Sequence, residues 1–418
     1  MFFPTLLTAF LAGTASAWMP GTDKDIRAQD GLSLFNATAK HPTARRWTPA
    51  SGKIRGVNLG SLFVFEPWIA ESAWSAMGCG AYKSEFDCVA GLGQAAANTA
   101  FQNHWNTWIT SADISEMSSY GINTIRIPVG YWMMESLVYS DSEHFPQGGL
   151  TYLESICAAA ANAGMYIIID MHGAPGAQVA SNPDTGQYAS TPGFYVDYQY
   201  ARGEKFLSWL TTNIHSNTAF RNVGMIGIVN EPVQNSAAAS MISSFYPAAY
   251  KAIRDAESAL GVTSNNYLHV EAMDKGWGSG DPNSGLSGGV SLAYDEHRYL
   301  KWDSSVAVSQ SAYLKSSCTY NPVSSTGGPT IVGEFSLSPP DNVENTAAWS
   351  TSSQAAFYKQ WFEAQVMGYE NHALGWIFWT WKSQLNDYRW SYQDAVKAGV
   401  IPKDLNSIAG SGACNGYT

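Results

Sequence analysis

MYIIIDMHG, residues 165–173, is a short run of β-branched apolar residues that ends in polar side chains. Such a run is typical of a strand buried on both faces of a parallel sheet. Seven further runs along the chain share this pattern: IRGVNLG (54–60), INTIRIPV (122–129), VGMIGIVNEP (223–232), YLHVEAM (267–273), GVSLAYDEHRY (289–299), PTIVGEFS (329–336) and ALGWIFWTWK (373–382).

Segments with apolar residues at helical spacing separate these eight runs. The periodicity predicts helices over 104–119, 151–163, 199–215, 236–260 and 351–368. Strands that alternate with helices indicate βαβ units and a parallel sheet. We therefore predict an α/β fold, a (β/α)8 TIM barrel formed by one domain over residues 54–418. An open, doubly wound sheet is the alternative, but no G-x-G-x-x-G follows the first strand.

The N-terminus has the features of an export signal. Residues 1–17 form an apolar run that ends in Ala15-Ser16-Ala17, a small-x-small triplet that suits cleavage before Trp18. We expect a secreted, extracellular protein, with a short membrane anchor as the alternative. Residues 18–53 are expected to form an N-terminal extension, which contains a glycosylation sequon at Asn36.

Five cysteines in an exported chain leave one without a partner. Cys79 and Cys88 flank a short polar loop and are the best local pair. Cys318 with Cys414 would fix the C-terminus to the rest of the chain. Cys157 lies in an Ala-rich helical stretch, where a buried inert thiol is expected.

The charge balance restricts the partners. A net charge of -11 argues against binding to nucleic acid or to an anionic membrane, since both require clustered cations. The chain contains 16 Trp and 22 Tyr residues, whose flat rings stack on the apolar faces of sugars. A neutral or cationic substrate fits this composition better than an anionic one, and we expect a monomer.

Two acidic residues end apolar strands in the same way, Glu231 in IVNEP and Glu334 in IVGEF. Hydrolysis of a glycosidic bond needs one carboxyl group that is protonated and one that is ionised. With the two groups about 5 to 5.5 Å apart, the ionised one attacks the anomeric carbon and the configuration is retained. The fourth and seventh strands of a barrel can bring two carboxylates that close.

Other polar and aromatic side chains also follow strand ends and would meet at one mouth of a barrel. Arg126 would keep a nearby carboxylate ionised, Asn230 would bind a sugar hydroxyl, and Tyr299 would orient Glu334. Because no His, Cys and carboxylate cluster has zinc spacing, we expect neither a metal ion nor a cofactor. The residues predicted to converge beside the two glutamates are Asn58, Arg126, His172, Asn230, His297, Tyr299 and Trp379.

The segment Trp379-Thr380-Trp381 presents two indoles on either side of a threonine. We expect one indole to point into the mouth and the other away from it. We predict that Trp379 lies under the cleaved sugar and that Trp381 packs elsewhere.

Eight strings in order resemble glycoside hydrolase family 5, especially its fungal glucanases: RGVNLGS, EPW, TIRIPVGYW, IIIDMHGAPG, NEP, DEHRY, GEFS and IFWTWK. The resemblance covers residues 54 to about 400 of this sequence. It implies a retaining mechanism with Glu231 as the acid/base and Glu334 as the nucleophile. It also implies that Glu66 binds the terminal glucose and that the residues named above at the strand ends support the reaction.

Residues 77–102 and 171–187 look more like the endo-β-1,6-glucanase branch of these enzymes than the exo-β-1,3-glucosidase branch. The residues alone cannot separate the two, since both substrates present the same equatorial hydroxyls at the cleaved glucose. A noncatalytic, sugar-binding wall protein is a third reading. Loss of either glutamate would mark that class, and both are present.

Overall fold

The computed structural model describes residues 52–322 and 328–417. Its central sheet has eight parallel strands in sequential order around a closed barrel. The strands are β1 (Ile54–Asn58), β2 (Thr124–Gly130), β3 (Tyr166–Gly173), β4 (Val223–Gly227), β5 (His269–Met273), β6 (Leu292–His297), β7 (Thr330–Glu334) and β8 (Gly375–Phe378).

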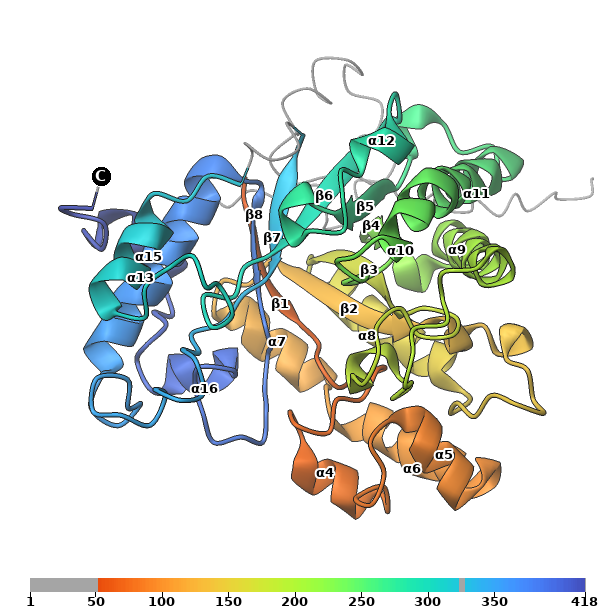
Figure 1. Cartoon of the computed structure of the whole chain (residues 1–418), viewed down its shortest axis with the longest axis horizontal. Coiled ribbons are helices and arrows are strands. Elements are labelled where there is room, and N and C mark those ends of the chain that lie inside the picture. Colours follow the sequence, from red (N-terminus) through yellow and green to blue (C-terminus); the bar gives the residue numbers. More distant parts are fainter. Residues whose placement is uncertain (1–51, 323–327, 418) are drawn as a thin grey trace, which may run out of the picture.

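The sheet closes into a barrel because β1 pairs with both β2 and β8. Gly56 lies opposite Thr124 of β2 on one side and opposite Ile377 of β8 on the other. A doubly wound sheet would leave two open edges, so this pairing excludes the alternative fold. The predicted (β/α)8 barrel is confirmed (Figure 1), and each strand lies within its predicted run except β2, which extends one residue past its run to Gly130.

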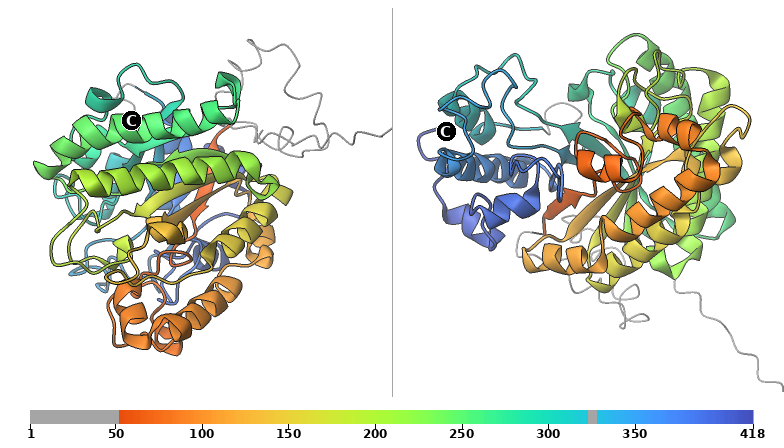
Figure 2. Two further views of the ribbon diagram at one scale, coloured as in Figure 1. Left: turned by 90° about the vertical axis from the view of Figure 1, so that its right-hand side faces the viewer. Right: turned by 90° about the horizontal axis from the view of Figure 1, so that it is seen from below.

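Helices surround the barrel, and three of them stand together at one end of it. Figures 1 and 2 show α4, α5 and α6 grouped beyond the C-terminal end of β1. The α-helices of the described chain are α4 (Glu71–Ala76), α5 (Glu85–Leu92), α6 (Gln94–Thr107), α7 (Ser111–Ser119), α8 (Gly149–Asn162), α9 (Asp197–Ser216), α10 (Ala237–Ser240), α11 (Tyr246–Ala259), α12 (Asn283–Leu286), α13 (Gln310–Cys318), α15 (Ala355–His372) and α16 (Tyr392–Lys397).

The single helix predicted over 104–119 is wrong, since two helices occupy this region. α6 ends at Thr107 and α7 starts at Ser111. The Asp113 carboxylate accepts hydrogen bonds from the backbone N–H (2.9 Å) and the hydroxyl (3.0 Å) of Thr110. These bonds satisfy groups at a helix start, so the chain begins a new helix instead of extending the first.

The helix predicted over 236–260 is present in three parts. Between α10 and α11 lies one π-helical turn, Met241–Phe245. Pro247 follows it and has no N–H to donate to the carbonyl of Ser243. The wider turn therefore occurs where one α-helical bond is missing.

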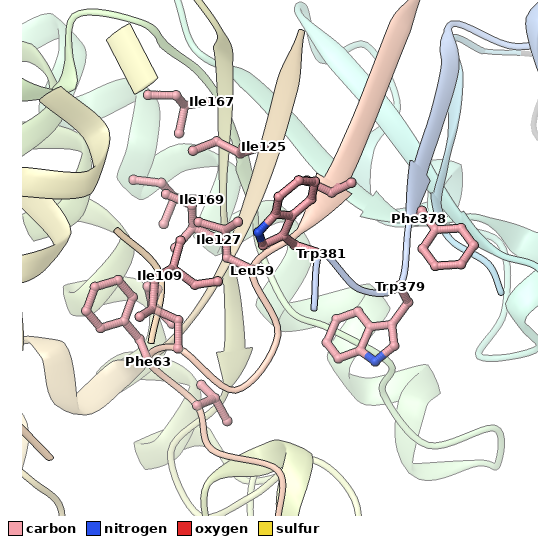
Figure 3. Close-up of a cluster of buried hydrophobic side chains, with 14 of the residues drawn as sticks. Leu59, Phe63, Ile109, Ile125, Ile127, Ile167, Ile169, Phe378, Trp379 and Trp381 are labelled. Carbon is pink, nitrogen blue, oxygen red and sulfur yellow. The ribbon is translucent and has the colours of Figure 1, made fainter. Parts of the chain in front are cut away.

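The inward face of the barrel changes from apolar to polar along strands such as β3 and β6. One buried cluster fills the N-terminal end with side chains that include Ile168 of β3 and Ala293 of β6. Two residues further along the same faces stand Asp170 and Asp295, because side chains alternate along a strand. The outward faces pack in a larger cluster under the helices, which Figure 3 shows with Ile125, Ile127, Ile167 and Ile169.

Both predicted disulfides are present, Cys79–Cys88 and Cys318–Cys414, and Cys157 is a buried free thiol. In residues 52–322 and 328–417, no helix is long and apolar enough to cross a membrane. The predicted signal peptide (1–17), the Asn36 sequon and nearly all of the predicted extension (18–53) lie outside the described residues.

Candidate active site

A cleft of about 700 Å³ opens at the C-terminal ends of the strands. Residues from the ends of β3, β4, β6, β7 and β8 meet in it, although they are far apart in sequence. Seven of the ten predicted site residues line it: Glu66, His172, Asn230, Glu231, Tyr299, Glu334 and Trp379. Arg126 and His297 lie beneath these residues and contact them directly, and Asn58 is buried beside Arg126 and accepts a hydrogen bond from it.

Two carboxylates face each other in this cleft. Glu334 is the last residue of β7, and Glu231 follows β4 with a backbone φ of 38°, a conformation that non-glycine residues rarely adopt. One oxygen of each carboxylate lies within 4.8 Å of the other. Their exposure differs, because 20% of the Glu231 side chain is accessible and only 6% of that of Glu334.

Glu334 is bonded on both oxygens. Arg126 donates to Oε1 (2.9 Å) and the Tyr299 hydroxyl donates to Oε2 (2.8 Å). Burial raises the pKa of Glu334 above its ordinary value, and the positive charges of His297 and Arg126 oppose that rise. Both hydrogen bonds favour the ionised form of this carboxyl group.

His297, on β6, lies between acidic groups. Its Nδ1 is 2.6 Å from Glu231 Oε1 and 3.4 Å from Glu334 Oε2, and its Nε2 is 3.1 Å from Asp295 Oδ2. Burial alone would lower the pKa of His297, but the charges of Glu334 and Asp295 and the hydrogen bonds to Asp295 and Glu231 raise it well above its ordinary value. The imidazolium form therefore supplies a positive charge between the carboxylates.

Glu231, His297 and Glu334 have the spacing of a possible metal site, since one ligand atom from each lies within 4.8 Å of the others. A metal ion requires a neutral imidazole as its ligand. The raised pKa of His297 favours the protonated ring, which cannot coordinate a metal through Nδ1. The donor chemistry thus fits a bound proton better than a bound metal ion.

Arg126, on β2, is the centre of a buried network below the carboxylates. Besides Glu334, its guanidinium donates to Asn58 Oδ1 (3.0 Å) and Asn230 Oδ1 (2.9 Å). It also lies 3.1 Å from Asp170 and 3.4 Å from Asp295. Burial alone would lower the pKa of Arg126, but these charges raise it, so the guanidinium stays charged.

A flat surface forms one wall of the cleft. The Trp379 indole and the His172 ring are stacked, with centroids 5.6 Å apart and planes at 9°. His172 Nδ1 is 2.8 Å from Asp170 Oδ2, which fixes the ring. Figure 3 shows Trp379 and Trp381 pointing in different directions, and Trp381 is wholly buried, with its indole N–H donating to Asp113. Trp379 lines the cleft and Trp381 does not, as expected, although both follow the end of β8 at Phe378; that Trp379 lies under the cleaved sugar stays a prediction.

A second pair of carboxyl groups, Glu66 and Asp184, lines the cleft. The Trp68 indole N–H donates to Glu66 Oε2 at 2.9 Å, and the Asn182 amide donates to Asp184 Oδ2 at 2.8 Å. Burial raises the pKa of both groups well above their ordinary values, and the Asp184 charge raises that of Glu66 further. Asp184 was not predicted, because it lies in a long loop after β3 without periodicity.

Three further tryptophans line the cleft and were also missed: Trp68, Trp302 and Trp390. The Trp68 and Trp390 rings are in edge contact at 5.1 Å, and the Trp302 ring lies 5.0 Å from that of Tyr299. Trp302 is 65% exposed and Trp68 is 39% exposed. Exposed indoles at a cleft edge are suited to stacking on sugars. The signal for Trp302 was its position three residues after Tyr299, on the same loop.

Known proteins resemble this chain over most of its length. The glucan endo-1,6-beta-glucosidase B of Emericella nidulans is 60% identical over 403 residues, which cover 96% of this chain and 97% of that protein. The glucan 1,3-beta-glucosidase of Blumeria graminis is 29% identical and covers 85% of this chain and 88% of its own.

Solved structures share the fold. The rutinosidase from Aspergillus niger superposes with a TM-score of 0.65 at 20% identity, over 84% of this chain and 98% of that one. The sequence model described as Cellulase (glycosyl hydrolase family 5) matches residues 89–385. With this match over most of the barrel, and with a relative 60% identical along nearly its whole length, the chain belongs to glycosyl hydrolase family 5.

Proposed function

We propose that this protein is a retaining glycoside hydrolase that cleaves β-1,6-linked glucan within the chain, with Glu334 as the nucleophile and Glu231 as the acid/base. The observation that carries the reaction type is the pair of carboxylates from β4 and β7, with oxygens within 4.8 Å of each other. A retaining reaction needs this short spacing, since an inverting one leaves room for a water molecule between the groups.

The surroundings of the two glutamates support their separate roles. The nucleophile must be ionised, and Glu334 accepts hydrogen bonds from Arg126 and Tyr299. The acid/base must reach the leaving oxygen and later a water molecule, and Glu231 is the more exposed of the two. In the first step Glu334 attacks the anomeric carbon while Glu231 protonates the leaving oxygen. In the second, Glu231 takes a proton from the water that releases the sugar.

His297 serves both steps. Its Nδ1–H faces Glu231 at 2.6 Å and Glu334 at 3.4 Å. Negative charge lies on Glu334 in the free enzyme and on Glu231 once that residue has given up its proton. A single imidazolium beside both carboxylates stabilises the charge in either place without moving.

Other side chains that line the cleft bind the sugar. The stacked pair of Trp379 and His172 offers a flat surface for the cleaved glucose, and Asn230 offers an amide beside the scissile bond. Glu66 and Asp184 offer hydrogen bonds to hydroxyl groups further along the cleft.

Substrate linkage is proposed from the relatives. A protein named for β-1,6-glucan is 60% identical to this chain, and one named for β-1,3-glucan is 29% identical. We also propose that the protein is secreted, in keeping with its two disulfides, which form in oxidising compartments.

Release of reducing sugar from β-1,6-glucan, β-1,3-glucan and cellulose tests the linkage. We expect the highest rate on β-1,6-glucan, with mixed oligosaccharides in the first minutes. Glucose as the only early product would contradict cleavage within the chain. Comparable binding of all three polymers with no hydrolysis would instead indicate a noncatalytic sugar-binding protein.

Azide distinguishes the roles of the glutamates. Glu334→Ala should turn over neither glucan nor a nitrophenyl β-glucoside, because neither substrate supplies a nucleophile. Glu231→Ala should form the intermediate from the activated glucoside and then stall. Azide needs no base, so it should restore turnover of Glu231→Ala and give a β-glucosyl azide by two inversions. An α-azide from Glu231→Ala, or β-azide rescue of Glu334→Ala, would contradict the assignment.

A further inference from the structure

We propose that Glu85, at the start of α5, is a positioning residue that holds Glu66 at a fixed distance from Asp184, whose loop is bonded to the next residue of the same helix, and that it thereby controls how tightly the cleft binds sugar. The proposal rests on the proposed function in one respect, that these two carboxyl groups bind sugar hydroxyls. Neither Glu85 nor α5 lines the cleft itself.

Glu85 is wholly buried and is bonded to the segment that carries Glu66. Its Oε1 accepts a hydrogen bond from the backbone N–H of Phe65 at 2.9 Å. Its Oε2 has no hydrogen-bond partner within residues 52–322 and 328–417. Burial raises the pKa of Glu85 well above its ordinary value, so this side chain acts as a neutral acid with one working acceptor.

The next residue of α5 is bonded to the loop that carries Asp184. The backbone N–H of Phe86 donates to the carbonyl of Gly186 at 3.0 Å, two residues after Asp184. Gly186 has a φ of +73°, and a Cβ added there would lie 2.1 Å from the Trp132 ring. The loop therefore has little freedom at the point where α5 holds it.

α5 is itself held on several sides. The Cys79–Cys88 disulfide joins it to the preceding turn, and the Ser84 side chain accepts a hydrogen bond from the Asp87 N–H. The Phe65 ring, next to the bonded N–H, lies 4.7 Å from the ring of Trp74. Two adjacent residues of one clamped helix thus fix two loops that come from β1 and β3.

The spacing of the two carboxyl groups matters because both must meet hydroxyls of one rigid sugar chain. Hydrogen bonds weaken steeply when their geometry is poor, and a misplacement of about 1 Å can cost a hundredfold in rate. Release of Phe65 would let Glu66 move relative to Asp184 while the catalytic pair stays in place. The loss should then appear in KM and leave kcat nearly unchanged.

Two substitutions of Glu85 separate the effect of its hydrogen bond from the effect of its charge. Glu85→Gln keeps the Oε1 acceptor and is neutral, as the buried acid is, so KM should stay within about twofold of wild type. Glu85→Ala removes the acceptor and should raise KM at least about tenfold, with kcat changed less than about threefold. If the Ala variant does not fold, Glu85→Asp replaces it, since it shortens the side chain and withdraws the acceptor.

A double-mutant cycle tests whether Glu85 acts through Glu66. In a Glu66→Ala background, Glu85→Ala should change KM by less than about twofold, because the group that it positions is gone. Glu257→Ala is the matched control, since Glu257 is also wholly buried and accepts a backbone N–H, from Leu268 at 2.7 Å, far from the cleft. It should lower the melting temperature without a change in KM.

The outcomes are distinct. Equal losses from Glu85→Ala with and without Glu66, or a loss in Glu85→Gln as large as in Glu85→Ala, would overturn the positioning role. The cycle is measured on whichever glucan the wild-type enzyme hydrolyses, so an incorrect linkage assignment leaves this test intact.

Discussion

Replacement of Tyr299 by Phe removes one hydrogen bond from the proposed nucleophile and leaves the ring in place. The hydroxyl donates to Glu334 Oε2 at 2.8 Å, and after its loss the nearest donor to that oxygen is His297 Nδ1 at 3.4 Å. Oε1 keeps its bond to Arg126. The variant therefore loses more stabilisation of the ionised form of Glu334 than of its neutral form.

The size of the effect follows from the strength of such a bond. A hydrogen bond to a charged group contributes about 1.5 to 3 kcal/mol, and about 1.4 kcal/mol corresponds to one pH unit in a pKa. The pKa of Glu334 should thus rise by about one to two pH units in Tyr299→Phe. Because the free enzyme needs this carboxylate ionised, the acid limb of kcat/KM should move to higher pH by the same amount.

The assay is kcat/KM on glucan as a function of pH for wild type and variant. Tyr313→Phe is the control, since its hydroxyl donates to the Leu300 carbonyl at 3.0 Å, outside the cleft. The melting temperature of Tyr299→Phe should change little, because the ring keeps its contact with Trp302. An acid limb that does not move, or that moves equally in Tyr313→Phe, would refute the reasoning.

Three further predictions concern the flat surface formed by Trp379, the dependence of stability on pH, and a disulfide. Trp379→Ala should lower glucanase activity far more than it lowers the melting temperature, and equal losses would make Trp379 a core residue. Burial raises the pKa of Glu296 to about 8, so the folded protein keeps a proton that the unfolded chain releases above its ordinary pKa of 4.5. The pKa of His297 is also raised, and the stabilising charge of its ring is lost at high pH. The melting temperature should therefore fall between about pH 5 and about pH 9, and Glu296→Gln should make this fall smaller. A melting temperature that rises over this range would contradict the prediction. Removal of the Cys318–Cys414 bridge, which spans 96 residues, should lower the free energy of unfolding by up to about 4 kcal/mol in urea titration, and an unchanged midpoint would count against this.

The barrel was predictable because its strands are buried on both faces. Runs such as residues 165–173 are nearly all apolar until the strand reaches the mouth, so the change to polar residues marks the functional end. The same change identified Glu231 and Glu334, and the structure brings these two side chains together.

What the sequence did not predict lies in loops and in hydrogen bonds between distant segments. Asp184 and Trp302 stand on connections without periodicity, where no pattern indicates which way a side chain points. The break between α6 and α7 depends on one carboxylate, Asp113, which competes with continued helix formation. Glu85 is an acidic residue in the first turn of a helix, where acidic residues are common. The sequence therefore does not indicate that its side chain is buried and accepts a hydrogen bond from the backbone of Phe65.

The Arg126 network also bears on how the enzyme assembles. The guanidinium stands on β2, and its partners come from β1, β3 and β6, from the end of β7 and from the segment after β4. A fragment ending after β4 would contain the cation and Glu231 but lack Asp295 and Glu334, and the complementary fragment would contain those two anions without their arginine. The first fragment would keep only the Arg126–Asp170 pair, and the second would keep only the contacts of His297 with Asp295 and Glu334, so neither would contain the whole network. The complete Arg126 network can therefore form only when the barrel closes. Two complementary fragments would regain hydrolytic activity only by docking into a complete barrel.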